Sequence, residues 1–67
     1  MNEIQLNGSP RMVDPGETLE ELIRKLGLDP RWVVAEVNGE AVGRDRFAGW
    51  LLAAGDKIEL IRAVAGG

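Results

Sequence analysis

The residues with the clearest chemical potential stand at the end of the sequence, which reads Val64-Ala65-Gly66-Gly67. Glycine has no Cβ and accepts most backbone conformations, so Gly66 and Gly67 can extend into a narrow channel and leave the last carbonyl carbon open to attack. Residues 63–67 would reach ~16 Å at ~3.3 Å per residue, enough to cross the wall of a pocket in another protein. The pattern predicts a flexible C-terminal tail whose Gly67 carboxylate takes part in acyl chemistry. The alternative is a frayed, inert end.

A free carboxylate is a poor acyl donor, and it is normally activated by attack on the α-phosphate of ATP, which gives an acyl-adenylate. The sequence offers no phosphate-binding loop for this step. Gly39, Gly43 and Gly49 lack the P-loop spacing, and no Lys-Ser or Lys-Thr pair follows them. We therefore expect no cofactor bound by the chain itself and a separate activating enzyme that uses ATP.

Other kinds of catalysis lack the necessary side chains. The chain has no Cys and no His, which excludes disulfides, thiolate or imidazole metal sites and His-activated hydroxyl nucleophiles. Lys25 and Lys57 are the only side-chain amines, and the 11 acidic residues are scattered along the sequence. These absences predict a substrate or partner of a larger protein and not an enzyme.

Charge and hydropathy limit the environment. The net charge of -3 argues against binding to nucleic acid, which normally requires a basic face. No apolar run approaches the ~20 residues of a membrane span, and the first residues lack the apolar region of a signal peptide. We expect a cytoplasmic protein that binds no membrane.

The tail requires a rigid body to aim it, and two hairpins are the first sign of that body. Residues 1–6 alternate, and Asn7-Gly8 predicts a two-residue turn into a return strand at 11–13. Asn38-Gly39 predicts a second turn, between strands at 32–37 and 41–42. Consecutive valines at 33 and 34 suggest that this strand is covered on both faces for part of its length.

A short helix follows the first hairpin. Thr18 and Glu21 have the spacing of a capping box, in which each side chain binds a free backbone N–H at the helix start. We expect Glu20 to pair with Arg24, and Glu21 with Lys25, on the outer face. One apolar stripe consists of Leu19, Leu22, Ile23 and Leu26. The stripe predicts that this helix of about two turns packs on a sheet.

The last predicted strand, residues 57–64, has Ile58 and Leu60 on its buried face. No hairpin precedes it, so it must insert between earlier strands or lie beside the first one. Residues 45–54 fit either a short helical turn or a loop. We therefore predict an α+β β-grasp (ubiquitin-like) fold with a mixed sheet of four or five strands on one helix. Residues 1–67 would form a single domain that includes the flexible tail, 63–67.

Over essentially its full length the chain resembles the ThiS family of sulfur carriers in the wider ubiquitin-like MoaD/ThiS superfamily. The resemblance depends on Leu6-Asn7-Gly8, Thr18-Leu19-Glu20-Glu21-Leu22, Val37-Asn38-Gly39-Glu40 with Val42 and Arg44, Gly55-Asp56-Lys57-Ile58-Glu59 and Val64-Ala65-Gly66-Gly67. One departure is Gly43, where the family often has Pro; it should loosen a loop without abolishing the carrier role.

The resemblance implies a sulfur carrier of thiamine biosynthesis. An E1-like adenylyltransferase (ThiF-like) would adenylate the Gly67 carboxylate with ATP and Mg²⁺. Sulfur from a persulfide, supplied by a donor such as a cysteine desulfurase, would convert it to a thiocarboxylate. A thiazole synthase (ThiG-like) would use that sulfur to build the thiazole ring.

Other functions stay open from the sequence. A MoaD-like carrier for molybdopterin synthesis shares the fold and the terminal Gly-Gly, and other thiocarboxylate carriers serve further pathways. A different class is a ubiquitin-like interaction module with an inert tail, or a modifier conjugated to lysines.

A surface beside the last strand should contact the partners, because it must position the tail. Ile61 lies on the face opposite Ile58 and Leu60, so Ile61 and Val64 are candidate apolar contacts. Arg62 either pairs with acidic groups of a partner or is simply solvated. Phe47 and Trp50 either close the end of the core or border this contact surface.

Overall fold

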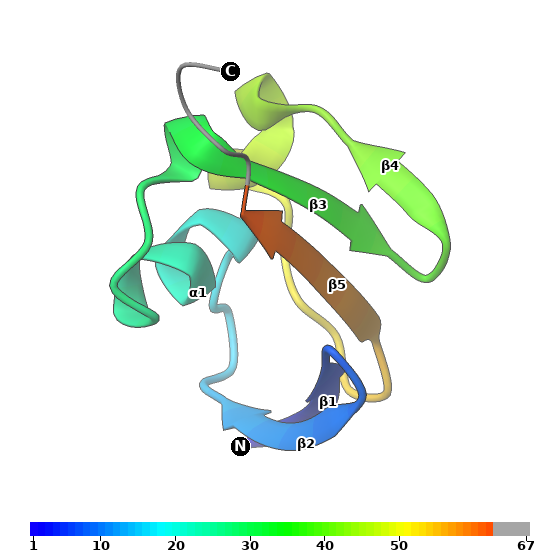
Figure 1. Cartoon of the computed structure of the whole chain (residues 1–67). Helices are drawn as coiled ribbons and strands as arrows, with labels where there is room; N and C mark the ends of the chain where they lie inside the picture. The colour runs from blue at the N-terminus through cyan, green and yellow to red at the C-terminus, as the bar shows by residue number, and fades with distance from the viewer. Residues whose placement is uncertain (63–67) are drawn as a thin grey trace.

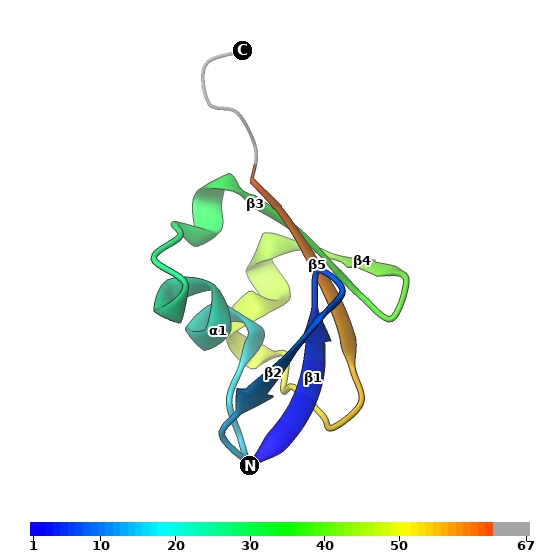
Figure 2. The ribbon, with the colours of Figure 1, turned by 60° about the horizontal axis from the view of Figure 1, so that its bottom comes forward.

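The computed structural model describes residues 1–62, and they form one five-stranded sheet with a helix on one face (Figure 1). The elements in chain order are β1 (Asn2–Leu6), β2 (Ser9–Val13), α1 (Leu19–Lys25), the 3₁₀ helix η1 (Pro30–Trp32), β3 (Val33–Val37), β4 (Glu40–Val42), the 3₁₀ helix η2 (Arg44–Gly49) and β5 (Lys57–Arg62). The strand order is β2-β1-β5-β3-β4. Figure 2 shows α1 and both 3₁₀ helices on the same side of the sheet.

The last strand inserts at the centre of the sheet. β5 runs parallel to β1 and antiparallel to β3, so it joins two hairpins that would otherwise be separate. Only a strand that returns after the helix can make both pairings, and this mixed sheet around one helix is the predicted β-grasp arrangement. The expected insertion between earlier strands is confirmed.

Both hairpins turn at the predicted Asn-Gly pairs. Asn7 and Asn38 have φ of 50° and 53°, in the left-handed region that short polar residues and glycine tolerate. β2 begins at Ser9, two residues earlier than expected, and includes Pro10 opposite Gln5. In a two-residue hairpin, the second residue pair from the turn, here Gln5 and Pro10, does not exchange hydrogen bonds. The missing N–H of Pro10 therefore faces the open edge of the sheet.

The helix α1 begins with the predicted capping box. The Glu21 N–H donates to Thr18 Oγ1 at 3.2 Å, and the Thr18 N–H donates to Glu21 Oε1 at 2.9 Å. These bonds from Thr18 hold the pKa of the Glu21 carboxyl below its ordinary value. A cap of this kind typically stabilises a protein by about 1 kcal/mol relative to Ala at the cap position.

One predicted ion pair of the helix is wrong and the other is confirmed. Arg24 Nη2 lies 3.9 Å from Glu20 Oε1, as expected. Lys25 does not pair with Glu21, because the cap turns that carboxylate toward the start of the helix. The Nζ of Lys25 instead donates to Oε1 of the buried Glu17 at 3.0 Å, and this bond raises the pKa of Lys25. This contact ties the β2–α1 loop to the helix.

The core lies between α1 and the inner face of the sheet. Its buried apolar side chains are Ile4, Val13, Leu19, Leu22, Ile23, Val33, Ala35, Val37, Val42, Phe47, Leu52, Ile58 and Leu60. Leu26, the fourth member of the predicted helical stripe, is partly buried against them. Phe47 and Leu52 complete the core from the region after β4.

The segment that the sequence left open contains a short helix and then a loop. Phe47, in η2, is fully buried, whereas Trp50 is half-buried against the core. The guanidinium carbon of Arg46 lies 4.7 Å from the centre of the Trp50 ring, a cation–π distance. The interpretation that Phe47 closes the end of the core is confirmed, whereas Trp50 packs on the core with part of its side chain exposed.

The expectation that β3 is covered on both faces is wrong. Val33 is buried, but Val34 is 51% exposed, because α1 covers only one face of the sheet. No helix within residues 1–62 has both the length and the apolar character to cross a membrane. In the same range, no three acidic side chains are grouped closely enough to hold a metal ion.

Candidate functional site

The end of β5 is where the described structure meets the predicted tail. Arg62, the last residue of β5, pairs with Val33 of β3. β5 is held from both sides by side chains of the two turns. Asn7 Oδ1 accepts from the Leu60 N–H at 2.9 Å, and Asn38 Oδ1 accepts from the Lys57 N–H at 2.9 Å. These bonds hold β5 to the turns on both sides of it.

Three exposed apolar side chains lie beside this end of β5, and we call them the apolar patch: Trp32, Val34 and Ile61. Their exposed fractions are 46%, 51% and 57%. Val34 and Ile61 are direct cross-strand partners on the outer face of the sheet, and Trp32 lies two residues before Val34. Large exposed apolar side chains grouped in this way are typical of protein-binding surfaces.

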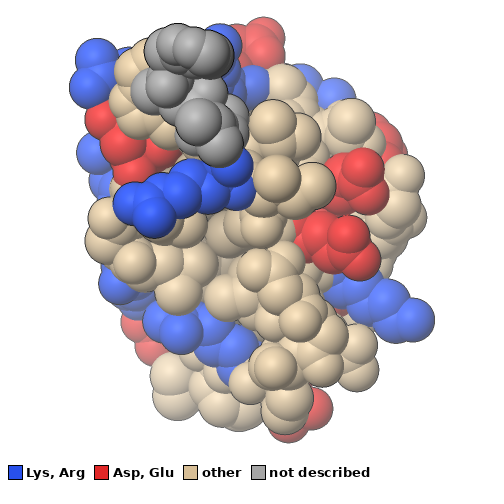
Figure 3. All heavy atoms as spheres, in the orientation of Figure 1, with Lys and Arg blue, Asp and Glu red and all other residues tan. Residues whose placement is uncertain are grey.

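The charged residues of β3 and β5 near the apolar patch lie on both faces of the sheet. Glu36 and Glu59 are directly opposite each other on β3 and β5, an arrangement that destabilises a sheet by repulsion. Arg62 is exposed and has no ion-pair partner among residues 1–62. Figure 3 shows a group of acidic side chains toward the right of the face it presents, beside a broad tan area. Arg62 pairs with the buried Val33, so it lies on the side of the sheet that carries α1, opposite the acidic pair.

Two of the predicted site residues, Ile61 and Arg62, lie at the end of β5, Ile61 on the outer face and Arg62 on the opposite one. The exposure predicted for Ile61 is confirmed, whereas its role as a contact stays a prediction. The other predicted site residues, Val64, Ala65, Gly66 and Gly67, lie outside the described residues.

Two residues of the apolar patch were missed by the sequence analysis. The signal for Val34 was present, because Val33 and Val34 point to opposite faces of one strand and only one helix was expected. The signal for Trp32 was weaker. Asp29 caps η1 and Pro30 occupies its first turn, the order typical of a helix start, so Trp32 ends a short helix instead of opening a buried strand.

Comparison with known proteins agrees with this geometry. The sequence model of the ThiS family matches residues 4–67. The crystal structure of thiamine biosynthesis protein ThiS from Geobacter metallireducens superposes with a TM-score of 0.80 at 29% identity, covering 97% of this chain and 99% of that one. An NMR structure of a computationally designed protein based on human erythrocytic ubiquitin superposes with a TM-score of 0.54 at 27% identity, covering 98% and 94%.

Two relatives are much longer proteins. The chain is 37% identical over 65 residues to a thiazole synthase of Magnetococcus marinus and 34% identical over 65 residues to a thiazole synthase of Paramagnetospirillum magneticum. Each match covers 97% of this chain but only 20% of the relative. The chain thus spans about a fifth of the length of the curated relatives that it matches.

Proposed function

The chain belongs to the ThiS family of ubiquitin-like sulfur carriers, and from this membership we propose that it supplies sulfur, as a thiocarboxylate on Gly67, for thiazole formation in thiamine biosynthesis. The single observation that supports this most is the family match, which extends from residue 4 to residue 67 and so includes the terminal Gly-Gly.

The proposed chemistry begins at the carboxylate of Gly67. One oxygen attacks the α-phosphate of ATP, pyrophosphate leaves, and the carboxyl group becomes a mixed anhydride with AMP. The outer sulfur of a persulfide then attacks the carbonyl carbon and AMP leaves. A second thiol cleaves the resulting S–S bond, which leaves the thiocarboxylate on Gly67 and a disulfide on the donor. Both thiols must come from partners because this chain has no Cys.

Three partners follow from these steps. A ThiF-like, E1-like adenylyltransferase binds ATP and Mg²⁺, and the carrier itself binds neither. A sulfur donor such as a cysteine desulfurase supplies the persulfide, and a ThiG-like thiazole synthase accepts the sulfur. The carrier acts in the cytoplasm as a substrate of these proteins and not as an enzyme.

The residues divide the work between binding and reaction. Gly66, Ala65 and Val64 enter the channel of the activating enzyme, where small side chains let the chain pass. Ile61 contacts the partner together with the rest of the apolar patch, and Arg62 pairs with an acidic group at the channel entrance.

The choice of pathway has its own support. Two proteins named thiazole synthase contain a segment similar to this chain, in Magnetococcus marinus and in Paramagnetospirillum magneticum. Segments that occur within one polypeptide commonly act in one process, so we favour thiazole formation over molybdopterin synthesis.

Deletion of Gly67 tests the function. The described core lies within residues 1–62, so we expect the truncated protein to keep its melting temperature and to lose thiazole formation in a reconstituted assay. Rescue of a thiamine auxotroph, without rescue of a molybdenum-cofactor mutant, would support the pathway. Full thiazole formation by the truncated protein would overturn the mechanism.

A further inference from the structure

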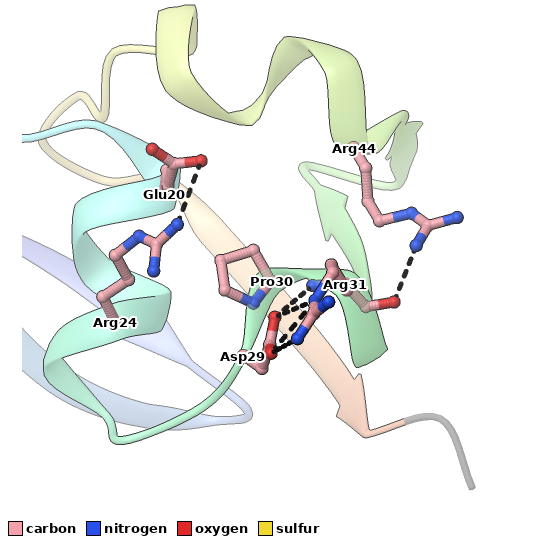
Figure 4. Close-up of a pocket in the computed structure, with 6 residues that line it drawn as sticks. All are labelled: Glu20, Arg24, Asp29, Pro30, Arg31 and Arg44. Atoms are coloured by element: carbon pink, nitrogen blue, oxygen red, sulfur yellow. Dashed lines mark hydrogen bonds and ion pairs between the residues drawn. The ribbon is translucent and has the colours of Figure 1, made fainter. Parts of the chain in front are cut away.

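An open pocket of about 370 Å³ lies between α1, η1 and η2, and it is unusually rich in arginine. Its walls are formed by Glu20, Arg24, Asp29, Pro30, Arg31 and Arg44, as Figure 4 shows. The walls contain three guanidinium groups and two carboxylates, so they have a net positive charge although the whole chain has a net charge of -3.

Both carboxylates of the pocket already have partners within its walls. Asp29 accepts from Arg31 Nη2 at 2.8 Å and from Arg31 Nε at 3.2 Å, and it also accepts from the Arg31 backbone N–H at 2.9 Å. Glu20 Oε1 lies 3.9 Å from Arg24 Nη2. Neither acid has an ion pair with Arg44.

Arg44 is therefore the unneutralised charge of this pocket. Its Nη1 donates to the backbone oxygen of Arg31 at 2.7 Å, which holds the guanidinium in place. No carboxylate among residues 1–62 forms an ion pair with it. A guanidinium has five N–H donors in a fixed planar arrangement, so Arg44 keeps donors free for an oxyanion.

The pocket lies next to the exit of the chain. Arg31 is in η1, two residues before Val33, and Val33 pairs with Arg62 at the end of β5. Figures 1 and 2 both place η1 beside the tip of β5. Arg62 and this pocket thus lie on the side of the sheet that carries α1, while the apolar patch lies on the outer face at the same end of β5.

We propose that the pocket lined by Arg24, Arg31 and Arg44 receives a carboxylate side chain of the activating enzyme when that enzyme takes up the chain end. This inference rests on the proposed function and names the contact that recognises the partner. A protein carboxylate fits better than the nucleotide. Residues 63–67 span up to ~16 Å when extended, which separates the pocket from the phosphate bound to Gly67.

Neutral variants of two arginines in η2 provide the test. Arg44→Gln removes the free charge of the pocket. Arg46→Gln is the matched control, because it makes the same change two residues away, where Arg46 stacks on Trp50 outside the pocket. Calorimetry at several salt concentrations would measure Kd for the ThiF-like adenylyltransferase, and release of pyrophosphate from ATP would follow activation in parallel.

We expect Arg44→Gln to raise Kd about 3- to 10-fold and to reduce its salt dependence, with Arg46→Gln close to the wild type. Arg44→Glu should weaken binding further. Equal Kd values for wild type, Arg44→Gln and Arg44→Glu would overturn the inference. If the wild type binds but releases no pyrophosphate from ATP, the proposed function fails while the role of the pocket is still decided by Kd.

Discussion

At the scale of single residues, the proposed partner contact depends on the exposure of Ile61. Ile61 and Val34 are exposed cross-strand neighbours, although burial of an apolar side chain of this size typically stabilises a protein or complex by about 1.5–3 kcal/mol. Their side chains contribute little to the core of the free protein. A partner that covers the apolar patch would recover this hydrophobic contribution on binding.

We expect Ile61→Gln to weaken binding of the activating enzyme about 10-fold, while the free energy of unfolding changes by less than about 0.5 kcal/mol. Met12→Gln is the matched control, since Met12 is 49% exposed on β2, the far edge of the same sheet. Titration calorimetry and thermal unfolding measure the two effects. Equal weakening by both variants would show that the contact surface is not centred on Ile61.

A second prediction at this scale concerns the pKa of Asp29. Hydrogen bonds from the Arg31 side chain lower this pKa from 3.8 to about 2. A depressed carboxyl pKa stabilises the folded state above the unfolded pKa. This contribution is lost as the pH falls from about 4 through about 2. An NMR titration of the Asp29 carboxyl should give a midpoint near 2. The midpoint should be higher in Arg31→Gln, which loses the guanidinium bonds but keeps the backbone N–H bond of residue 31.

Arg46→Gln should leave the Asp29 midpoint unchanged, because Arg46 contacts Trp50 and Glu40 instead. The thermal stability of the wild type should also fall more steeply than that of Arg31→Gln between pH 4 and pH 2, the interval set by the two pKa values of Asp29. A wild-type midpoint near 3.8 would contradict the geometry of the Asp29–Arg31 pair.

At the scale of elements, β5 depends on turns that are distant in sequence. The two Asn-Gly turns do more than reverse the chain. Their asparagine side chains accept from backbone N–H groups of β5, Asn7 from Leu60 and Asn38 from Lys57. β1 itself pairs with β5 through only two residue pairs, Gln5 with Lys57 and Leu6 with Ile58. The asparagines thus extend the hydrogen bonding of β5 beyond the strands.

Asn7→Gly keeps a residue suited to positive φ but removes the acceptor for Leu60. We expect a loss of about 1 kcal/mol in unfolding free energy and faster hydrogen exchange at the Leu60 amide. Asn38→Gly should affect the Lys57 amide instead, so each variant is the control for the other. Unchanged exchange at both amides would show that these side-chain bonds do not hold β5.

Some of these features could be predicted from the sequence and others could not, for physical reasons. Turns and caps depend on neighbouring residues, so Asn7-Gly8, Asn38-Gly39 and the Thr18–Glu21 box were predictable. The Lys25–Glu17 bond was not, because both Glu17 and Glu21 lie within reach of Lys25 and only the folded loop selects between them.

At the scale of the whole molecule, the fold followed from the order of the elements, but the partner surface did not. A strand that comes after a helix and two hairpins has few places to pair, which left the β-grasp sheet as the expected outcome. The arginine pocket depends on Arg24, Arg31 and Arg44, which come from three elements. Their spacing follows no period, so no sequence pattern could indicate that they meet.

The central expectation is that Gly67 becomes a thiocarboxylate, and one measurement tests it directly. The purified chain would be incubated with ATP, Mg²⁺, a persulfide donor with thiol reductant and the adenylyltransferase. After removal of small thiols it would be treated with iodoacetamide and weighed by intact mass spectrometry. Replacement of oxygen by sulfur alone resembles the oxidation of Met1 or Met12 in mass. Alkylation removes this ambiguity because the chain has no Cys to react.

We predict one carbamidomethyl group per chain, located on Gly67 by fragmentation, and none when ATP is omitted or Gly67 is deleted. An unmodified chain, in a mixture where the same enzymes convert a known carrier, would contradict the assignment of Gly67 as the sulfur-bearing residue.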